Sequence, residues 1–248
     1  MESAKTRTLG PRLAVGFSLG GVFLLSLLHP LAFTLLVALA SGFAAAELAR
    51  AMRQAGWHVP RLIAALAPAI LIATYLFGAM GQWLGFLVAF GALVAWRILT
   101  LLVQSTSQSA KQTLRDFGGT AFVLVYVPVL LSFAIQLVDI PGGRAWVLGM
   151  VLTVVAIDTF GYLIGRFFGK TKLSPEISPK KTWEGLFASI LGGLFGGIIT
   201  ALVTGASLWF GLLFGAALLV SSVMGDLSES LIKRDLEVKD MGNVLPGH

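Results

Sequence analysis

Long apolar blocks separated by short polar connections dominate this chain. A bilayer core of about 30 Å requires about 20 apolar residues per helix, and the blocks come close to this length. Together they predict an all-α fold, a polytopic membrane helical bundle with about eight transmembrane helices. The blocks lie at about 13–28, 31–48, 62–80, 83–103, 117–138, 145–165, 184–204 and 207–225.

The composition supports a membrane protein. Hydrophobic residues make up 56% of the chain, charged residues 12%, and the mean hydropathy is +0.87. A soluble domain has about one quarter charged residues, so this class is excluded. The chain has no cysteine, which excludes disulfides and thiolate metal sites.

Basic residues predict the orientation in the membrane. With a cytoplasmic N-terminus, eight spans place nearly all basic connections on the cytoplasmic side and only Arg144 clearly outside. Arg97 falls inside the fourth span, and we expect its head to snorkel towards the cytoplasm. The net charge of +6 is then a topology signal with some attraction to anionic lipid, and nucleic acid is not an expected partner. We expect a multi-pass protein of the cell (inner or plasma) membrane, with the N-terminus and active site cytoplasmic.

Two segments carry most of the candidate chemistry, and the first begins in the sixth predicted helix. Asp158 lies about two turns inside it, where an ionised carboxylate at a helix centre costs up to ~2.5–3.5 kcal/mol. Such a residue requires a partner or a function. Gly161, Gly165 and Gly169 follow at intervals of four, which indicates close helix packing or, less favoured, close approach of a ligand. Overlapping pairs of glycines in the seventh predicted helix indicate packing: Gly192, Gly193, Gly196 and Gly197.

A short polar stretch precedes the seventh predicted helix. Its residues Ser178, Lys180, Lys181 and Thr182 suit phosphate binding, because the start of a helix also favours anions. The alternative is that the lysines only anchor the topology. A phosphate-binding P-loop is excluded, since Gly165 and Gly169 have three residues between them rather than four.

The second segment starts at Asp226. Helical spacing places Asp226, Glu229 or Ser230, and Lys233 on one face, and Arg234 follows. A carboxylate that can hold a hard cation therefore lies one or two turns from side chains that can hold phosphate oxygens. This combination favours phosphoryl or nucleotidyl transfer over the alternative, a solvated helix with a Glu229–Lys233 pair.

Three motifs resemble one enzyme family. Ser230-x-Ile-Lys-Arg234, Lys239-Asp-x-Gly242 and Leu245-Pro-x-His248 together resemble the C-terminal signature of the phosphatidate cytidylyltransferase family. The segments Asp158–Arg166 and Ser178–Gly185 are also similar to that family. Its pattern continues past the histidine with two glycines, an Asp-Arg-x-Asp stretch and a further helix, a ninth here. We therefore expect a chain ending at His248 to hold its metal poorly.

The resemblance implies a reaction and a set of site residues. Phosphatidic acid would attack the α-phosphorus of CTP, giving CDP-diacylglycerol and pyrophosphate at the cytoplasmic membrane face. The implied catalytic residues are Asp226, Lys233, Arg234 and Asp158, with Asp226 also the ligand of Mg²⁺, in unknown number. The implied substrate-binding residues are Ser178, Lys180, Lys181, Thr182, Ser230, Lys239, Asp240 and His248.

This interpretation divides the chain into N-terminal transmembrane helices at 1–140 and a catalytic region at 141–248, with cytoplasmic loops at 166–183 and 226–248. Membrane lipid is a further partner, and the glycine-lined helices leave room for a homodimer. Two alternatives stay open: a CTP-dependent polyprenol or dolichol kinase, which would transfer the γ-phosphoryl group, and a transporter with Asp158 on an ion path. Against transport, the sequence shows no internal repeat.

Overall fold

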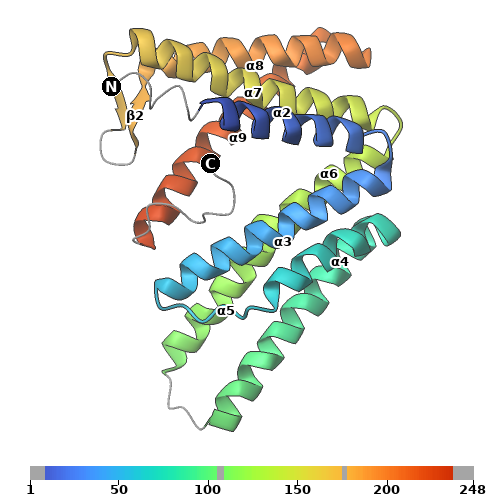
Figure 1. Ribbon diagram of the computed structural model, residues 1–248, viewed down its shortest axis with the longest axis vertical. Helices are drawn as coiled ribbons and strands as arrows, with labels where there is room; N and C mark the ends of the chain where they lie inside the picture. The colour runs from blue at the N-terminus through green and yellow to red at the C-terminus, as the bar shows by residue number, and fades with distance from the viewer. Residues whose placement is uncertain (1–8, 105–108, 175–177, 237–248) are drawn as a thin grey trace. The chain divides into compact units, whose positions relative to one another are not determined.

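The computed structural model describes residues 9–104, 109–174 and 178–236, and they form two compact units that divide between Asp139 and Ile140 (Figure 1). The helices of the first unit are α2 (Leu9–Ser26), α3 (Pro30–Gln54), α4 (Ile63–Gln104), α5 (Ala110–Leu124), the π-helix η1 (Val125–Val129) and α6 (Leu130–Asp139). The second unit contains α7 (Gly143–Phe168), strands β1 (Lys172–Ser174) and β2 (Ser178–Thr182), α8 (Trp183–Thr204) and α9 (Leu208–Asp235).

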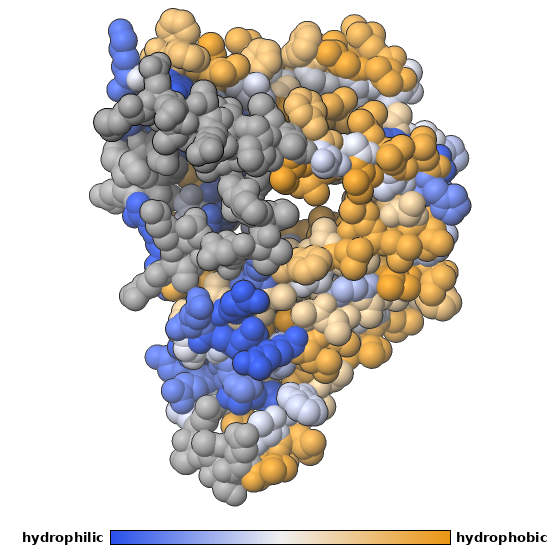
Figure 2. Space-filling model, in the orientation of Figure 1, coloured by the Kyte–Doolittle hydropathy of each residue, from blue (hydrophilic) through white to orange (hydrophobic). Residues whose placement is uncertain are grey.

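The expected all-α membrane bundle is confirmed. Six helical segments of the described chain are long and apolar enough to cross a membrane, and Val15–Ser26 is a shorter apolar helix. Apolar side chains cover much of the visible surface in Figure 2, as expected of helices that face lipid. The count of eight is not matched helix for helix, and one antiparallel pair of short strands, β1 and β2, interrupts the helices.

Part of the difference in count lies in α4, which contains two predicted spans. Gly78 has φ 58° and ψ −141°, which lies outside the helical region. Glycine adopts this conformation more easily than residues with a side chain. The helix reverses at Gly78. Two contacts across the bend show this: Gly85 lies against Ile70, and a methyl group at Gly81 would collide with the Ala73 carbonyl. The two halves of α4 therefore run back along each other, as Figure 1 shows.

The fifth predicted span is a continuous run of α5, η1 and α6. Pro128 has no N–H to donate, which disturbs an α-helix from within, and here the chain widens into a π-turn. The Val129 carbonyl then accepts hydrogen bonds from Gln82 Nε2 at 3.2 Å and Ser132 Oγ at 2.7 Å. Gln136 in turn donates to Gln82 Oε1 at 2.8 Å, which ties α6 to α4.

Arg97 does not snorkel, so that expectation is wrong. Its Nη2 lies 2.8 Å from Asp116 Oδ2, and both side chains are about 95% enclosed, with 5% and 4% exposed. A buried carboxylate on α5 therefore satisfies the charge within the unit. No helical spacing in the sequence links the two residues, because they belong to different helices.

Glycines hold the helices of the second unit together. A methyl group at Gly192 of α8 would lie 2.7 Å from the Ala156 carbonyl of α7. One at Gly193 would lie 3.1 Å from the Gly215 carbonyl of α9, so α8 is in close contact with both neighbours. The predicted packing role of the α8 glycines is confirmed, and Gly161 and Gly165 likewise face α8 through Ser189 and Gly185.

Candidate active site

A cavity of about 580 Å³ lies within the second unit, where α7 ends and α8 begins. Because α8 runs antiparallel to both α7 and α9, residues near the end of α7, the start of α8 and the second half of α9 line this cavity. The lining residues are Ile157, Asp158, Gly161, Tyr162, Gly165, Arg166, Lys172, Leu173, Lys181, Thr182, Gly185, Leu186, Ser189, Ser222, Val223 and Asp226.

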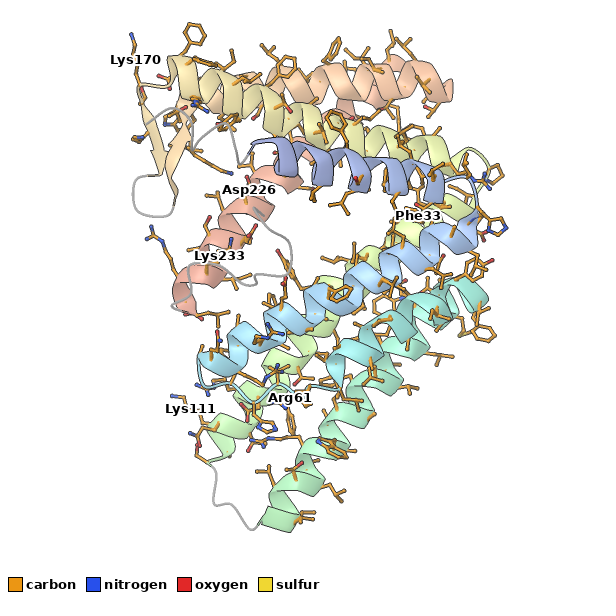
Figure 3. All side chains as sticks on the ribbon, in the orientation of Figure 1. Phe33, Arg61, Lys111, Lys170, Asp226 and Lys233 are labelled. Atoms are coloured by element: carbon orange, nitrogen blue, oxygen red, sulfur yellow. The ribbon has the colours of Figure 1, made fainter. Side chains whose placement is uncertain are left out.

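An ion pair joins the two segments that carried the sequence prediction. Lys181 Nζ lies 2.6 Å from Asp226 Oδ2, which connects the strand β2 to α9. The side chains are 27% and 51% exposed, so both remain within reach of a ligand. Figure 3 shows Asp226 on the part of α9 before Lys233.

A second carboxylate belongs to the same cavity. Asp158 on α7 accepts a hydrogen bond from Ser222 Oγ of α9 at 3.4 Å. Ser222 lies one turn before Asp226, so one face of α9 carries both a carboxylate and the hydroxyl that contacts the other carboxylate. Two acidic side chains from different helices thus line one cavity.

Cations line the cavity as well. Besides Lys181, Arg166 and Lys172 contribute guanidinium and ammonium groups. Arg166 Nη1 donates to Tyr162 Oη at 2.5 Å, and its guanidinium carbon lies 5.7 Å from the centre of that ring. Tyr162 therefore supports Arg166 along the last turns of α7.

The short hairpin positions Lys181. Lys172 of β1 pairs with Thr182 of β2 in antiparallel register. Thr182 Oγ1 accepts a hydrogen bond from Gly185 N at 3.2 Å and so caps α8. The Glu184 carboxylate accepts from Thr171 N at 3.1 Å, which ties the start of the hairpin to the first turn of α8.

The structure brings together some of the predicted site residues. Asp158, Lys181, Thr182 and Asp226 line the cavity, although the Thr182 hydroxyl serves as the helix cap. Lys239, Asp240 and His248 lie outside the described residues, as do the side chains of Ser178 and Lys180. Their predicted roles stay predictions.

Three predicted residues of α9 lie beyond the cavity. Lys233 pairs with Glu229 at 2.6 Å, and Ser230 Oγ donates to the Asp226 carbonyl of its own helix at 2.8 Å. Arg234 is exposed. None of the three lines the cavity described above, and their roles in substrate binding stay predictions.

Sequence reasoning missed Ser222, Lys172 and Ser189 as lining residues. Ser222 had a signal, since it precedes Asp226 by four residues and so shares its helical face. Lys172 and Ser189 had no comparable signal in the sequence. Lys172 reaches the cavity through the hairpin, and Ser189 through the contact between α7 and α8.

The acidic residues present fit a divalent cation only in part. Among the described residues, no group of three Asp, Glu or His side chains could hold a metal ion. Asp158 and Asp226 supply two carboxylates beside Ser222. Mg²⁺ commonly takes one or two carboxylates and completes its shell with water and substrate phosphates, so these two residues fit that mode.

Comparison with known proteins adds a decisive observation. Residues 11–248 match the cytidylyltransferase family. The chain belongs to this family. The phosphatidate cytidylyltransferases of Mycobacterium tuberculosis and Mycobacterium leprae are 37% and 35% identical to it, over 98% of this chain and 76% and 81% of their own lengths. That of Pseudomonas aeruginosa is 39% identical over 63% of this chain and 59% of its own length.

Membership of the cytidylyltransferase family confirms the resemblance expected from the motifs and the enzyme class, a nucleotidyltransferase. It also extends the likeness to the apolar N-terminal helices, in which the sequence offered no motif. The cavity residues gain a context, since nucleotidyl transfer acts on charged phosphate groups, which cationic side chains can bind.

Proposed function

We propose that this cytidylyltransferase transfers the cytidylyl group of CTP to phosphatidic acid, forming CDP-diacylglycerol and releasing pyrophosphate. The relatives' names support this choice of lipid substrate. The observation that carries the assignment to a site is the Lys181–Asp226 pair, because it unites both polar segments at one cavity with Asp158.

In the proposed reaction, an oxygen of the phosphatidate phosphate attacks the α-phosphorus of CTP in line. A new P–O bond forms while the bond from the α-phosphorus to the bridging oxygen breaks, and pyrophosphate carries away the electron pair. Phosphatidate is already largely ionised near neutral pH, with a second phosphate pKa near ~6 by analogy with other phosphomonoesters. The protein therefore mainly positions the two phosphates and neutralises charge.

Cationic and polar residues of the cavity and of the following turns of α9 each have a task in this proposal. Lys181, Lys172 and Arg166 bind phosphate oxygens of CTP or phosphatidate, with Tyr162 holding the guanidinium of Arg166. Lys181 exchanges its contact with Asp226 for a substrate phosphate when the substrates enter. Lys233, Arg234 and Ser230 stand further along α9 and serve, in this proposal, the outer part of the triphosphate.

Asp226 and Asp158 would hold Mg²⁺, with Ser222 keeping Asp158 in place. When bound, the cation neutralises charge on the phosphates in the transition state. A hydrogen-bonding hydroxyl and a lysine beside the carboxylates limit their mutual repulsion before substrate arrives.

The localisation forms a further part of the proposal. The helices that can span a membrane support a multi-pass membrane protein. We place the cavity on the cytoplasmic face of the cell membrane, because basic residues concentrate in the connections on its side and CTP is a cytoplasmic substrate.

A product assay on the variant Asp226→Asn tests this function. The substitution removes a negative charge at nearly constant volume, and we expect CDP-lipid formation to fall by about 100-fold or more, the range for loss of one charge-stabilising group. Mass spectrometry should detect CDP-diacylglycerol with pyrophosphate in the unaltered protein, whereas a lipid kinase would give lipid phosphate with CDP.

Asp235→Asn is the matched control. It makes the same chemical change at an exposed position on the same helix, two turns beyond Asp226, and Asp235 does not line the cavity. Turnover in this control should stay within about twofold of the unaltered protein. Undiminished turnover in Asp226→Asn would remove Asp226 from the metal site.

A further inference from the structure

The first unit contains a cavity of its own with cationic walls. Its volume is about 630 Å³, and it lies where α3 ends and α4 begins. Figure 2 shows hydrophilic residues gathered over this end of α3 and the start of α5, and Figure 3 labels Arg61 and Lys111 there. The lining residues are Ala46, Ala49, Arg50, Arg53, Gln54, Arg61, Ile63 and Ala64.

The charge of this cavity is one-sided. Three guanidinium groups line it, and its lining contains no carboxylate. Within the described ranges, neither Arg50 nor Arg61 has an acidic partner within 4.0 Å. Because arginine stays protonated at any physiological pH, the cavity presents concentrated positive charge to a ligand.

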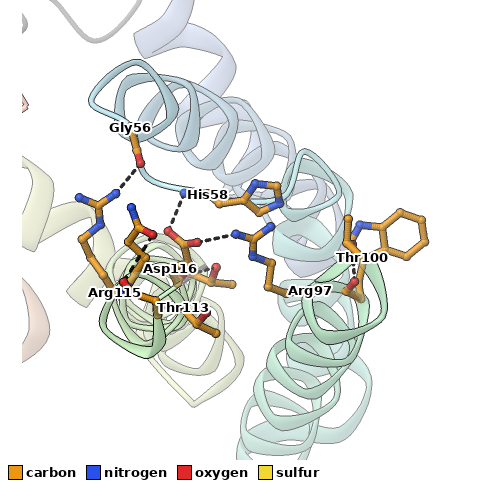
Figure 4. A network of polar contacts seen from close by, with 11 residues as sticks. Gly56, His58, Arg97, Thr100, Thr113, Arg115 and Asp116 are labelled. Atoms are coloured by element: carbon orange, nitrogen blue, oxygen red, sulfur yellow. Dashed lines mark hydrogen bonds and ion pairs between the residues drawn. The ribbon is translucent and has the colours of Figure 1, made fainter. Parts of the chain in front are cut away.

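A network of polar contacts fixes the connection that carries Arg61 (Figure 4). Asp116 Oδ1 accepts from His58 N at 2.8 Å, while its Oδ2 pairs with Arg97. Arg115 donates to the Gly56 carbonyl and lies 5.1 Å from the centre of the Trp57 ring. A buried ion pair thus holds the 55–62 connection in place.

Arg53 contacts the 55–62 connection and also lines the cationic cavity. Its Nη1 donates to the Val59 carbonyl at 2.9 Å, so it braces the connection, and it also lines the cationic cavity. Arg53 is therefore positioned before any ligand binds, which lowers the entropy lost when this side chain binds, while Arg50 and Arg61 are exposed and line the same cavity. Basic residues that serve only as topological anchors require neither a cavity nor a braced connection.

The remaining walls of the cavity are apolar. Ala46 and Ala64 are partly exposed on this side, and the fully enclosed Ala49 and Ile63 lie behind them. The helices α3 and α4 are long apolar segments that can span a membrane, so their junction lies near a membrane boundary. Lipid phosphates lie at this depth, directly beside the first methylenes of their acyl chains.

We propose that Arg50, Arg53 and Arg61 form a binding site for the phosphate group of an anionic glycerophospholipid, in addition to the candidate active site. The guanidinium forks bind the phosphate oxygens, and the partly exposed Ala46 and Ala64 contact the glycerol and upper acyl chain. A free phosphate ion would use the cations but gain nothing from the apolar wall. The site does not depend on which substrate the enzyme uses.

Native mass spectrometry of the full chain in detergent tests the site. The probes are phosphatidylglycerol, phosphatidylcholine with the same acyl chains, and inorganic phosphate. The unaltered protein should retain phosphatidylglycerol in preference to phosphatidylcholine, because the latter carries no net charge. A large excess of inorganic phosphate should fail to displace the lipid.

Three variants distinguish a fitted site from general attraction. Arg50→Gln with Arg61→Gln should weaken phosphatidylglycerol retention by about tenfold or more, since two charge-assisted contacts are lost. Arg50→Lys with Arg61→Lys keeps the charge and the topology but removes the planar forks, and should give an intermediate loss. Lys111→Gln with Lys170→Gln removes two charges that do not line this cavity and should retain lipid normally.

Two results would overturn the proposal. Equal lipid retention in the unaltered protein and the Arg→Gln double variant would show that the arginines bind no lipid. Displacement of phosphatidylglycerol by inorganic phosphate would show a site for the ion alone. Thermal unfolding of each variant checks folding, and the Arg→Lys variant decides the outcome if the Arg→Gln variant is unstable. Since the readout is binding, it is independent of CDP-lipid synthesis.

Discussion

Each unit of this protein contains an ion pair between an aspartate and a basic residue, and the two pairs have opposite environments. Arg97 and Asp116 in the first unit are 5% and 4% exposed. Lys181 and Asp226 in the second are 27% and 51% exposed and line a cavity. The enclosed pair has no room to exchange partners and serves the structure, whereas the open pair can release its charges to a ligand.

The helices of the two units also pack by different means. Side-chain hydrogen bonds such as Gln136 to Gln82 join helices in the first unit. In the second unit, glycines of α8 lie directly against the backbones of α7 and α9. Glycine packing brings these helices into backbone contact, and a buried hydrogen bond from Ser189 Oγ to the Ile157 carbonyl at 2.9 Å adds to it. The aspartates, lysines and arginine at the helix ends remain for substrate. The following changes test this contrast, from the largest expected effect to the smallest.

Asp116→Ala should cause the largest loss of stability. It leaves Arg97 buried without its counter-ion, and breaking such a pair typically costs about 3–5 kcal/mol. Thermal unfolding in detergent should show a marked fall in Tm. Lys181→Ala should cost less than about 1 kcal/mol, because its pair is solvent-accessible. Similar losses in both variants would erase the distinction between the pairs.

Gly192→Ala should give the next largest effect. The added methyl group would lie 2.7 Å from the Ala156 carbonyl, which forces α7 and α8 apart, and overpacking of this kind costs about 1–3 kcal/mol. Gly225→Ala is the control, because nothing lies within 4 Å of its methyl position, and it should be neutral or slightly stabilising. If both variants unfold alike, glycine packing does not distinguish the second unit.

Much of the fold could be predicted from the sequence, because span length and hydrophobicity are local properties. The positions of the helices and the packing role of Gly192 and its neighbours follow from them. The reversal at Gly78 was visible only as a gap between two spans. The Arg97–Asp116 pair could not be predicted, since it depends on how α4 and α5 meet and not on a spacing within either helix.

For the candidate site, too, single residues could be predicted from the sequence, but the contacts between them could not. Asp158 was identified because a carboxylate inside a span is costly. Lys181 was identified from its place before the start of a helix, and Asp226 from its helical spacing to Lys233. Their meeting at one cavity was not predictable residue by residue, as Lys181 and Asp226 are 45 positions apart. Helical spacing on α9 pointed forward from Asp226 to Lys233, whereas the structure uses the turn before it, at Ser222.

Lys181→Met should separate binding from stability. If Lys181 contacts a substrate phosphate, its loss should raise the Michaelis constant for CTP or phosphatidate by about tenfold, equivalent to about 1.4 kcal/mol, with little change in Tm. Lys170→Met removes a charge from the same connection but not from the cavity, and should leave the kinetics unchanged. Unaltered kinetics in Lys181→Met would return this lysine to the role of a topological anchor.

Ser222→Ala should have the smallest effect. The hydroxyl donates to Asp158 at 3.4 Å, near the upper limit for a hydrogen bond, so its loss should cost about 0.5–1 kcal/mol and lower turnover by about twofold to fivefold. Tm should stay within about 1 °C, because the bond lies at an open cavity rather than in the core. Ser221→Ala changes the neighbouring exposed serine, which does not line the cavity, and should match the unaltered enzyme in a CDP-lipid assay. Equal turnover in both serine variants would show that Asp158 keeps its position without Ser222. A loss only in Ser222→Ala would mean that even a weak contact at the cavity of the second unit contributes to turnover, unlike the enclosed contacts of the first unit.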